Sequence, residues 1–143
     1  MVRRIETASA EQTKAVGADL AAELDAGDVV VLRGELGAGK TTFVRGACEA
    51  LGVETAVTSP TFTIGQRYHG RLPVSHIDLY RIASLDHEDP SLLSDYLDRE
   101  AVTFIEWPPA DEAALGELAQ ITWRVALEHA GGDRRMIELA KAQ

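Results

Sequence analysis

The sequence predicts an α/β fold, in which a mixed sheet of about seven strands is flanked by helices. Two segments, 28–34 (DVVVLRG) and 101–107 (AVTFIEW), are almost continuously apolar, which is typical of parallel strands covered on both faces. Segments 9–27 and 41–52 instead have apolar residues at helical spacing. Segments 61–81 and 120–140 alternate apolar and polar residues around glycine turns, as antiparallel hairpins do. Strands interspersed with helices predict the α/β class.

The first half of the chain predicts two strands and two helices. Residues 3–8 (RRIETA) form a short strand, and Ser9 offers an N-cap to a helix that has Val16, Leu20 and Leu24 on one face. Gly27 is expected to end this helix. The buried strand 28–34 then leads through a glycine-rich loop into a helix that ends at Gly52.

The second half predicts the remaining strands. Segment 61–81 forms a hairpin that turns near 69–70, and residues 84–99 form one or two short helices with Pro90 at the start of SLLSDYLD. The strand 101–107 is followed by a short helix over 110–118. Segment 120–140 closes the chain with a hairpin joined at 131–132.

Length and composition limit the classes of function. The 143 residues suit a single domain, 1–143, without room for a separate acceptor-substrate domain. A net charge of -9 repels phosphate backbones, so a role with nucleic acid would need a partner. The single cysteine, Cys48, lies among small apolar residues and is expected to be a core thiol. Without a signal peptide or an 18-residue apolar stretch, we expect a cytoplasmic protein with no membrane partner.

A glycine-rich motif stands between the predicted buried strand and the following helix. Residues 34–41, GELGAGKT, fit the P-loop pattern G-x-x-x-x-G-K-[ST] in the context that the pattern requires. Glycines let backbone N–H groups converge on phosphate oxygens at a helix N-terminus. Lys40 supplies a charge to the β- and γ-phosphates, Thr41 offers a hydroxyl to Mg²⁺, and Thr42 lies on the α-phosphate side. The predicted cofactor-binding residues are Glu35, Leu36, Gly37, Ala38, Gly39, Lys40, Thr41 and Thr42.

The motif predicts a P-loop NTPase-like sandwich that binds a nucleoside triphosphate with Mg²⁺. The N-K-x-D and D-x-x-G elements typical of GTPases do not occur in the sequence, which favours ATP. Phosphoryl transfer then needs acids at the ends of neighbouring strands. Asp78 follows Val74 and Ile77, and Glu106 follows a longer apolar run. We assign Glu106 with Thr41 to the metal, and Asp78 to the attacking water or a metal-bound water. Lys40, Asp78 and Glu106 are the predicted catalytic residues, and the residues alone leave the reverse assignment of the two acids open.

Other polar or aromatic residues have two interpretations each. Ser59, Thr61 and Thr63 fit either a nucleotide-responsive switch loop or an alternating strand. Trp107 fits either a structural aromatic or a cover over the nucleotide or a partner surface. Three arginines fit either solvated strand positions or contacts with the base or phosphates: Arg124, Arg134 and Arg135.

Four motifs, taken in this order and at these spacings, resemble the bacterial TsaE (YjeE) family. They are GELGAGKTTFVRG at 34–46, SPTFT at 59–63, HIDLYR at 76–81 and FIEWPP at 104–109. The family consists of small P-loop ATPases needed to make threonylcarbamoyladenosine in tRNA. The stretch 86–98 departs from the family pattern, because Pro90 interrupts a helix that is more regular in other members.

The resemblance implies more than the residues alone predict. It implies binding of ATP and Mg²⁺, weak hydrolysis by the protein alone, and action with the TsaB and TsaD proteins on the adenosine next to the anticodon, with tRNA contacted indirectly. It carries over the roles of Lys40, Thr41 and Thr42 in the loop, Asp78 in D-L-Y-R, and Glu106 with Trp107 in I-E-W.

Two other functions compete with this interpretation. A small P-loop kinase would phosphorylate a nucleoside or metabolite and would need an acceptor pocket and a lid with arginines. Arg67, Arg71 and Arg81 are candidates, although no compact R-x-x-x-R signal occurs. A nucleotide sensor without hydrolysis is the other alternative, and the presence of both Asp78 and Glu106 argues against it.

Overall fold

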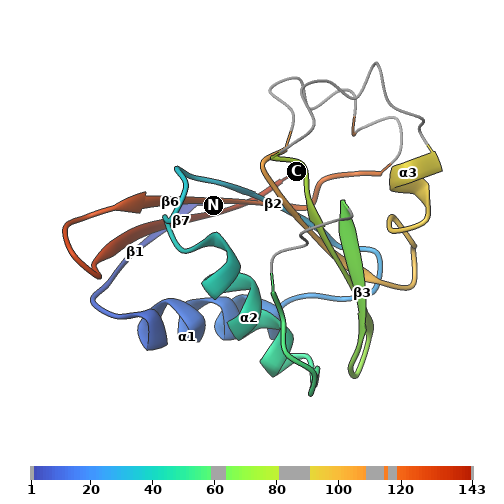
Figure 1. Ribbon diagram of the computed structural model, residues 1–143, viewed down its shortest axis with the longest axis horizontal. Coiled ribbons are helices and arrows are strands. Elements are labelled where there is room, and N and C mark those ends of the chain that lie inside the picture. The colour runs from blue at the N-terminus through green and yellow to red at the C-terminus, as the bar shows by residue number, and fades with distance from the viewer. Residues whose placement is uncertain (1, 59–63, 81–90, 109–114, 116–118, 143) are drawn as a thin grey trace.

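The structure is a computed structural model, and it describes residues 2–58, 64–80, 91–108, 115 and 119–142. These residues form a mixed sheet of seven strands with helices on its faces (Figure 1). The strands are β1 (Val2–Thr7), β2 (Val29–Arg33), β3 (Gly65–His69), β4 (Pro73–Asp78), β5 (Val102–Glu106), β6 (Trp123–His129) and β7 (Arg135–Lys141). The helices are α1 (Ala10–Ala21), α2 (Lys40–Ala50) and α3 (Ser91–Ser94). The predicted α/β class with seven strands is confirmed.

Parallel strands occupy the centre of the sheet. The strand order is β1-β7-β6-β2-β5-β4-β3, in which β6, β2, β5 and β4 are parallel neighbours. The hairpin partners β3 and β7 run antiparallel to this block, and β1 pairs antiparallel with β7. Leu32, Glu106 and Asp78 are aligned across three parallel strands, so the carboxyl ends of these strands meet at one place. In α/β sheets such a place is where ligands bind.

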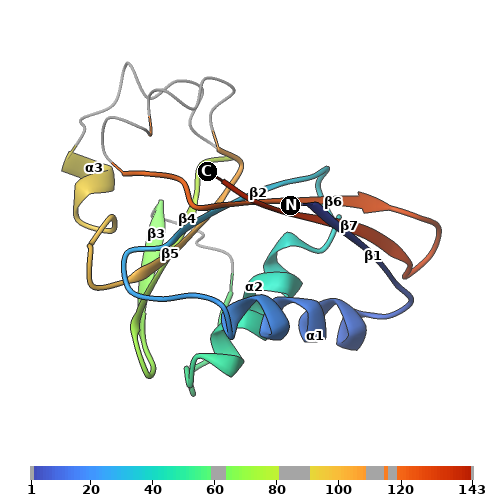
Figure 2. The ribbon, with the colours of Figure 1, turned by 180° about the vertical axis from the view of Figure 1, so that it is seen from behind.

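Each face of the sheet contributes to a hydrophobic core. Helices α1 and α2 lie together on one face, as Figures 1 and 2 show from opposite sides. On that face Phe43 of α2 belongs to one cluster with Val30, Leu32 and Phe104 of the central strands. On the opposite face, α3 covers the part of the sheet near β4 and β5, and Leu93 joins a second cluster there. The parallel strands are therefore covered on both sides, as their apolar sequences predict.

Helix α1 begins as predicted and ends earlier than predicted. The Ser9 side chain accepts a hydrogen bond from the Gln12 N–H at 3.2 Å, which is an N-cap. The helix stops at Ala21, so the prediction that it extends to Gly27 is wrong. The backbone tightens into turns at 23–24, and the Gly27 N–H donates to the Ala101 carbonyl at 2.9 Å. Gly27, with φ of 91°, belongs to the turn that enters β2.

The remaining elements follow the sequence closely. Both hairpins are confirmed, with β3 paired to β4 and β6 paired to β7. Helix α2 ends at Ala50, and Gly52 follows with φ of 85°. Of the predicted helical stretch 84–99, residues 91–99 are described: α3 occupies 91–94, whereas 95–99 form turns and loop, so the prediction that the helical stretch extends to 99 is wrong. Pro90 and, apart from Leu115, the predicted helix 110–118 lie outside the described residues.

Cys48 is a core thiol, as predicted. It is fully buried in the cluster beneath α2, and burial raises its pKa to about 12. The thiol is therefore protonated at neutral pH, which makes it a poor nucleophile. Within the described ranges, no helix combines the length and apolar character needed to span a bilayer.

Candidate nucleotide site

The glycine-rich loop connects β2 to α2 at the carboxyl edge of the parallel strands. Gly39 is the N-cap of α2 and has φ of 100°, and Gly37 has φ of 78°. Side chains other than glycine rarely adopt this left-handed conformation. In the part of the chain that the structure describes, no side chain caps the start of α2. The positive end of the helix dipole and the first amide groups therefore face the space in front of the loop, as an anion site requires.

Lys40 is folded back onto its own loop. Its Nζ donates to the carbonyl oxygens of Gly34 at 2.6 Å and Glu35 at 2.9 Å, and it lies 4.0 Å from the ring centroid of Trp107. The residue is 4% exposed. Burial lowers the pKa of Lys40, and the charges of Glu106 and Asp78 oppose this shift. The buried ammonium group thus shares this site with two carboxylates.

Glu106 ends β5 and is 2% exposed, although it is an acid. The Thr41 hydroxyl lies 3.0 and 3.2 Å from the two carboxylate oxygens of Glu106. On the other side, Nε2 of His76 lies 2.5 Å from Glu106 Oε2. The structure therefore brings together the two residues predicted to hold the metal.

His76 was not predicted as a site residue. It alternates with Val74 and Asp78 along β4, and residues two apart on a strand share a face. This spacing was the available signal, because it places His76 on the same face as Asp78. What the sequence does not show is that β5 lies next to β4, with Glu106 opposite Asp78.

Asp78 lies at the end of β4, directly opposite Glu106 in the register of the two strands. Its Oδ1 accepts a hydrogen bond from the Tyr80 N–H at 2.9 Å. Burial raises the pKa of Asp78, with a further increase from the charge of Glu106; the Tyr80 N–H and the Lys40 ammonium act in the opposite direction. Asp78 is more open to solvent than Glu106, which suits contact with a mobile water molecule.

Trp107 has a strained backbone. It is the one residue other than glycine with positive φ in the described ranges, at 56°, and bulky side chains rarely adopt this conformation. Its N–H donates to the Leu32 carbonyl at 3.2 Å, and its ring packs on Tyr80 with 4.8 Å between centroids. The turn sets the indole over Lys40. The indole thus lies over Lys40 at the rim of the cavity, and its role as a structural aromatic or as a cover over a nucleotide or partner stays a prediction.

All but two of the predicted binding and catalytic residues line a cavity of about 280 Å³. Its lining consists of Leu36, Gly37, Gly39, Lys40, Thr41, Thr42, Asp78, Glu106 and Trp107. Of the predicted loop residues, Glu35 contributes a carbonyl to Lys40, while Ala38 is buried away from the lining. The cavity thus joins the glycine loop to both predicted acids.

The donors at this cavity fit Mg²⁺. Thr41 and Glu106 present a hydroxyl and a carboxylate in contact with each other, and Asp78 adds a second carboxylate to the same lining. Among the described residues, no group of three or more His, Cys, Asp or Glu forms a metal cage. Mg²⁺ prefers oxygen ligands and keeps few protein ligands, because phosphates and water complete its shell. The arrangement matches that preference.

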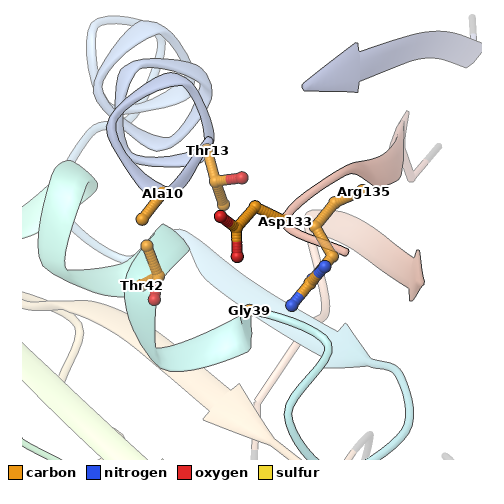
Figure 3. Close-up of a pocket in the computed structure, with 6 residues that line it drawn as sticks. All are labelled: Ala10, Thr13, Gly39, Thr42, Asp133 and Arg135. Carbon is orange, nitrogen blue, oxygen red and sulfur yellow. The ribbon is translucent and has the colours of Figure 1, made fainter. Parts of the chain in front are cut away.

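A second, smaller pocket of about 60 Å³ adjoins the loop on the side of Thr42 (Figure 3). Ala10 and Thr13 of α1, Gly39 and Thr42 at the start of α2, and Asp133 with Arg135 of the last hairpin line it. Arg135 also donates to the Gly37 carbonyl at 3.2 Å. Three distant parts of the sequence meet here, so the sequence pattern alone could not identify this pocket.

The other candidate residues are placed differently from one another. Arg135 contacts the glycine loop, whereas Arg134 pairs with Glu6 at 2.5 Å on the surface. Arg124 is exposed on β6, on the face opposite the neighbouring buried residues Trp123 and Val125. Of the three arginines, Arg135 therefore fits a nucleotide contact. Ser59, Thr61 and Thr63 lie outside the described residues.

Comparisons with known proteins identify the family of this chain. The family model described as "Threonylcarbamoyl adenosine biosynthesis protein TsaE" matches residues 7–137. The chain belongs to the TsaE family. It is 40% identical over 132 residues to the TsaE protein of Bacillus subtilis, covering 92% of this chain and 80% of the relative. It is 38% identical to the TsaE protein of Treponema pallidum, covering 96% of this chain and 99% of the relative.

A solved TsaE-like structure shares the fold. The crystal structure of Bacillus YdiB superposes with a TM-score of 0.74 at 34% sequence identity, and the match covers 100% of this chain and 88% of the YdiB chain. The match supports the P-loop NTPase-like arrangement of the sheet and helices. The family resemblance predicted from the four motifs is confirmed.

Proposed function

We propose that this TsaE-family chain is a Mg²⁺-dependent ATP-binding and ATP-hydrolysing subunit. It supports threonylcarbamoylation of the tRNA adenosine next to the anticodon, together with the TsaB and TsaD proteins. The observation that carries the proposal is the contact between Thr41 of the glycine loop and buried Glu106, in one cavity with Lys40 and Asp78. The named relatives and the family model support the pathway.

The phosphates of ATP bind to the loop at the start of α2. The amide groups of the loop and the dipole of α2 attract the anion, and the uncapped start of α2 leaves room for it. Lys40 exchanges its two carbonyl partners for phosphate oxygens, which are the stronger acceptors for an ammonium group. Trp107 shields this charge pair from water on the outer side.

Thr41 and Glu106 hold the metal in this proposal, and Asp78 orients water. When bound, Mg²⁺ neutralises charge on the phosphates. Glu106 can stay ionised in its buried position because a cation is its partner. Asp78, which is more open to solvent, accepts a hydrogen bond from the attacking water and aligns it with the terminal phosphate.

The nucleoside end of ATP extends beyond Thr42 into the smaller pocket of Figure 3. This direction follows from the loop, since Thr42 lies on the α-phosphate side of the site. Arg135 joins the pocket to the loop through the Gly37 carbonyl, and Asp133 offers a carboxylate to the sugar or base.

The function is tested by adding labelled ATP to the chain with and without purified TsaB and TsaD. We expect slow release of phosphate to water by the chain alone and faster release with both partners. Each partner without the chain is the control. Transfer of the label to a nucleoside or metabolite would instead support a kinase. Arg67, a candidate lid arginine for a kinase, instead donates to the Asp98 carboxylate and the Asp95 carbonyl and does not line the cavity. Indifference to both partners would contradict the proposed role.

A further inference from the structure

His76 is a buried polar residue that the proposed chemistry does not use. Its side chain is 0% exposed, and its Nε2 lies 2.5 Å from Glu106 Oε2. Its other ring nitrogen, Nδ1, is also buried and has no hydrogen-bond partner among the described residues. Among the described residues, the contact with Glu106 is therefore the hydrogen bond that satisfies this buried imidazole.

The contacts determine which ring nitrogen carries the proton. Nε2 faces a carboxylate oxygen, which only accepts hydrogen bonds when ionised. A proton on Nδ1 would be a buried donor without an acceptor, and such a donor is costly. The arrangement that satisfies both constraints is the neutral imidazole with its proton on Nε2, donating to Glu106.

This hydrogen bond restricts the rotation of the Glu106 carboxylate. Thr41 approaches both oxygens of Glu106 from the side of the glycine loop, whereas His76 approaches Oε2 from β4. Without His76, Glu106 could rotate about its side chain and lose its orientation toward Thr41. Groups that hold a metal-binding carboxylate in this way typically change metal affinity or activity by about 10–100-fold when they are removed.

We propose that His76 is a positioning residue, whose Nε2–H holds Glu106 in the orientation that binds Mg²⁺ beside Thr41. The role belongs to the proposed function, since it requires a metal at Glu106. His76, on β4, thus supports the pair Thr41 and Glu106 through its contact with Glu106 and does not itself bind the metal.

Two amide substitutions at His76 test the hydrogen-bond donor at the position of Nε2 separately from the size and polarity of the side chain. In His76→Gln the amide nitrogen reaches the position of Nε2, and in His76→Asn it reaches that of Nδ1. His76→Leu removes the donor at similar volume. Ser75→Ala is the matched control, because Ser75 is a fully buried neighbour on β4 whose hydroxyl has no partner among the described residues.

The readout is the dissociation constant of ATP, measured with Mg²⁺ and with EDTA for each variant. We expect His76→Asn and His76→Leu to lose about tenfold or more of the Mg²⁺-dependent part of the affinity, with binding in EDTA unchanged. His76→Gln and Ser75→Ala should stay close to the parent. If His76→Asn matched His76→Gln, or if all His76 variants lost binding equally in EDTA, the positioning role would be wrong.

A second readout does not depend on nucleotide. The ¹⁵N chemical shifts of the His76 ring should show a neutral imidazole protonated at Nε2, and Glu106→Ala should change them. A proton on Nδ1 would overturn the inference even if the parent bound ATP with Mg²⁺ as proposed. If the parent bound no ATP at all while the ring showed the Nε2 proton, the proposed function would fail and the hydrogen bond would stand as a structural contact.

Discussion

Glu106 is an acidic residue whose side chain is almost completely buried. A buried carboxylate is costly unless hydrogen bonds or a cation compensate it. Its neighbours are a hydroxyl, an imidazole and, across the same cavity, the Lys40 ammonium. A strand that simply surfaced into solvent would not bury its terminal acid to 2% exposure. A metal ion bound to this carboxylate would compensate the free-energy cost of burying it.

Glu106→Gln tests that role directly. The substitution keeps the size of the side chain and removes the charge. Loss of a charged partner in a buried site costs about 2–5 kcal/mol, which corresponds to about 30-fold or more. We expect at least that loss in partner-stimulated ATP hydrolysis at fixed Mg²⁺, with partial recovery as Mg²⁺ is raised. Glu138→Gln, on β7 beside exposed Arg4, is the control and should behave as the parent. Equal Mg²⁺ requirements in parent and Glu106→Gln would contradict the assignment.

The ionised Asp78 carboxylate should lower the free energy of unfolding at neutral pH. Burial raises its pKa above the ordinary value of 3.8, so the folded state disfavours the charged form. Asp78→Asn removes the charge and keeps an oxygen for the Tyr80 N–H. We expect the variant to unfold at higher urea concentration than the parent at pH 7. The difference should shrink as pH falls through the raised pKa of the folded state and vanish below 3.8, because Asp78 is then protonated in both the folded and the unfolded state.

The same variant should hydrolyse ATP more slowly, since Asp78 orients water in the proposed mechanism. Greater stability with lower activity is the usual result of removing a destabilising functional group. A stability difference that did not change with pH would show that the charge of Asp78 is not its cause.

At the scale of elements, α1 and α2 touch through glycines. A Cβ atom added at Gly46 would lie 2.0 Å from the Lys14 carbonyl oxygen, and one added at Gly17 would lie 2.1 Å from the Phe43 carbonyl oxygen. Backbone meets backbone here, so neither helix can shift without moving the other. Since Phe43 lies one turn into α2, the contact also fixes the start of the helix that forms the anion site.

Gly46→Ala tests this packing. Alanine is a better helix former than glycine by about 1 kcal/mol, so propensity alone predicts greater stability. The clash with Lys14 predicts the opposite, a loss of about 1–3 kcal/mol in the free energy of unfolding. Urea denaturation followed by circular dichroism distinguishes the two by sign. A more stable Gly46→Ala variant would show that the helices are not in close contact.

The central strands could be predicted from the sequence, whereas the end of α1 could not. Val29–Arg33 and Val102–Glu106 were identifiable as central strands because burial on both faces leaves a local apolar pattern. The end of α1 was not, because the last turn is replaced by hydrogen bonds at 23–24 and by the pairing of Gly27 with Ala101, 74 residues away. A long-range contact leaves no signal in a local pattern.

The same distinction applies to the site. The glycine loop, Asp78 and Glu106 were predicted because each has a local motif or follows an apolar strand. His76 and the pocket of Figure 3 depend on which strands and helices are neighbours. Strand order is set by the packing of the whole chain, so a single sequence could not place these residues together.

For the whole molecule, charge predicts how the chain meets tRNA. With a net charge of -9, the free chain should not bind tRNA to a measurable extent at physiological salt, because the interaction with phosphate backbones is repulsive on average. Filter binding with labelled tRNA checks this, with the complex of TsaB and TsaD as the comparison. Tight, salt-sensitive binding by the chain alone would contradict indirect contact with tRNA.

In the proposed function, the glycine loop and Glu106 together form one Mg²⁺-ATP site. Calorimetric titration of ATP into the unmodified chain, once with Mg²⁺ and once with EDTA, tests it most directly. We expect saturable binding with one ATP per chain, and higher affinity with Mg²⁺ because Thr41 and Glu106 would share the metal with the phosphates. An absence of binding, or the same affinity with Mg²⁺ and with EDTA, would contradict it.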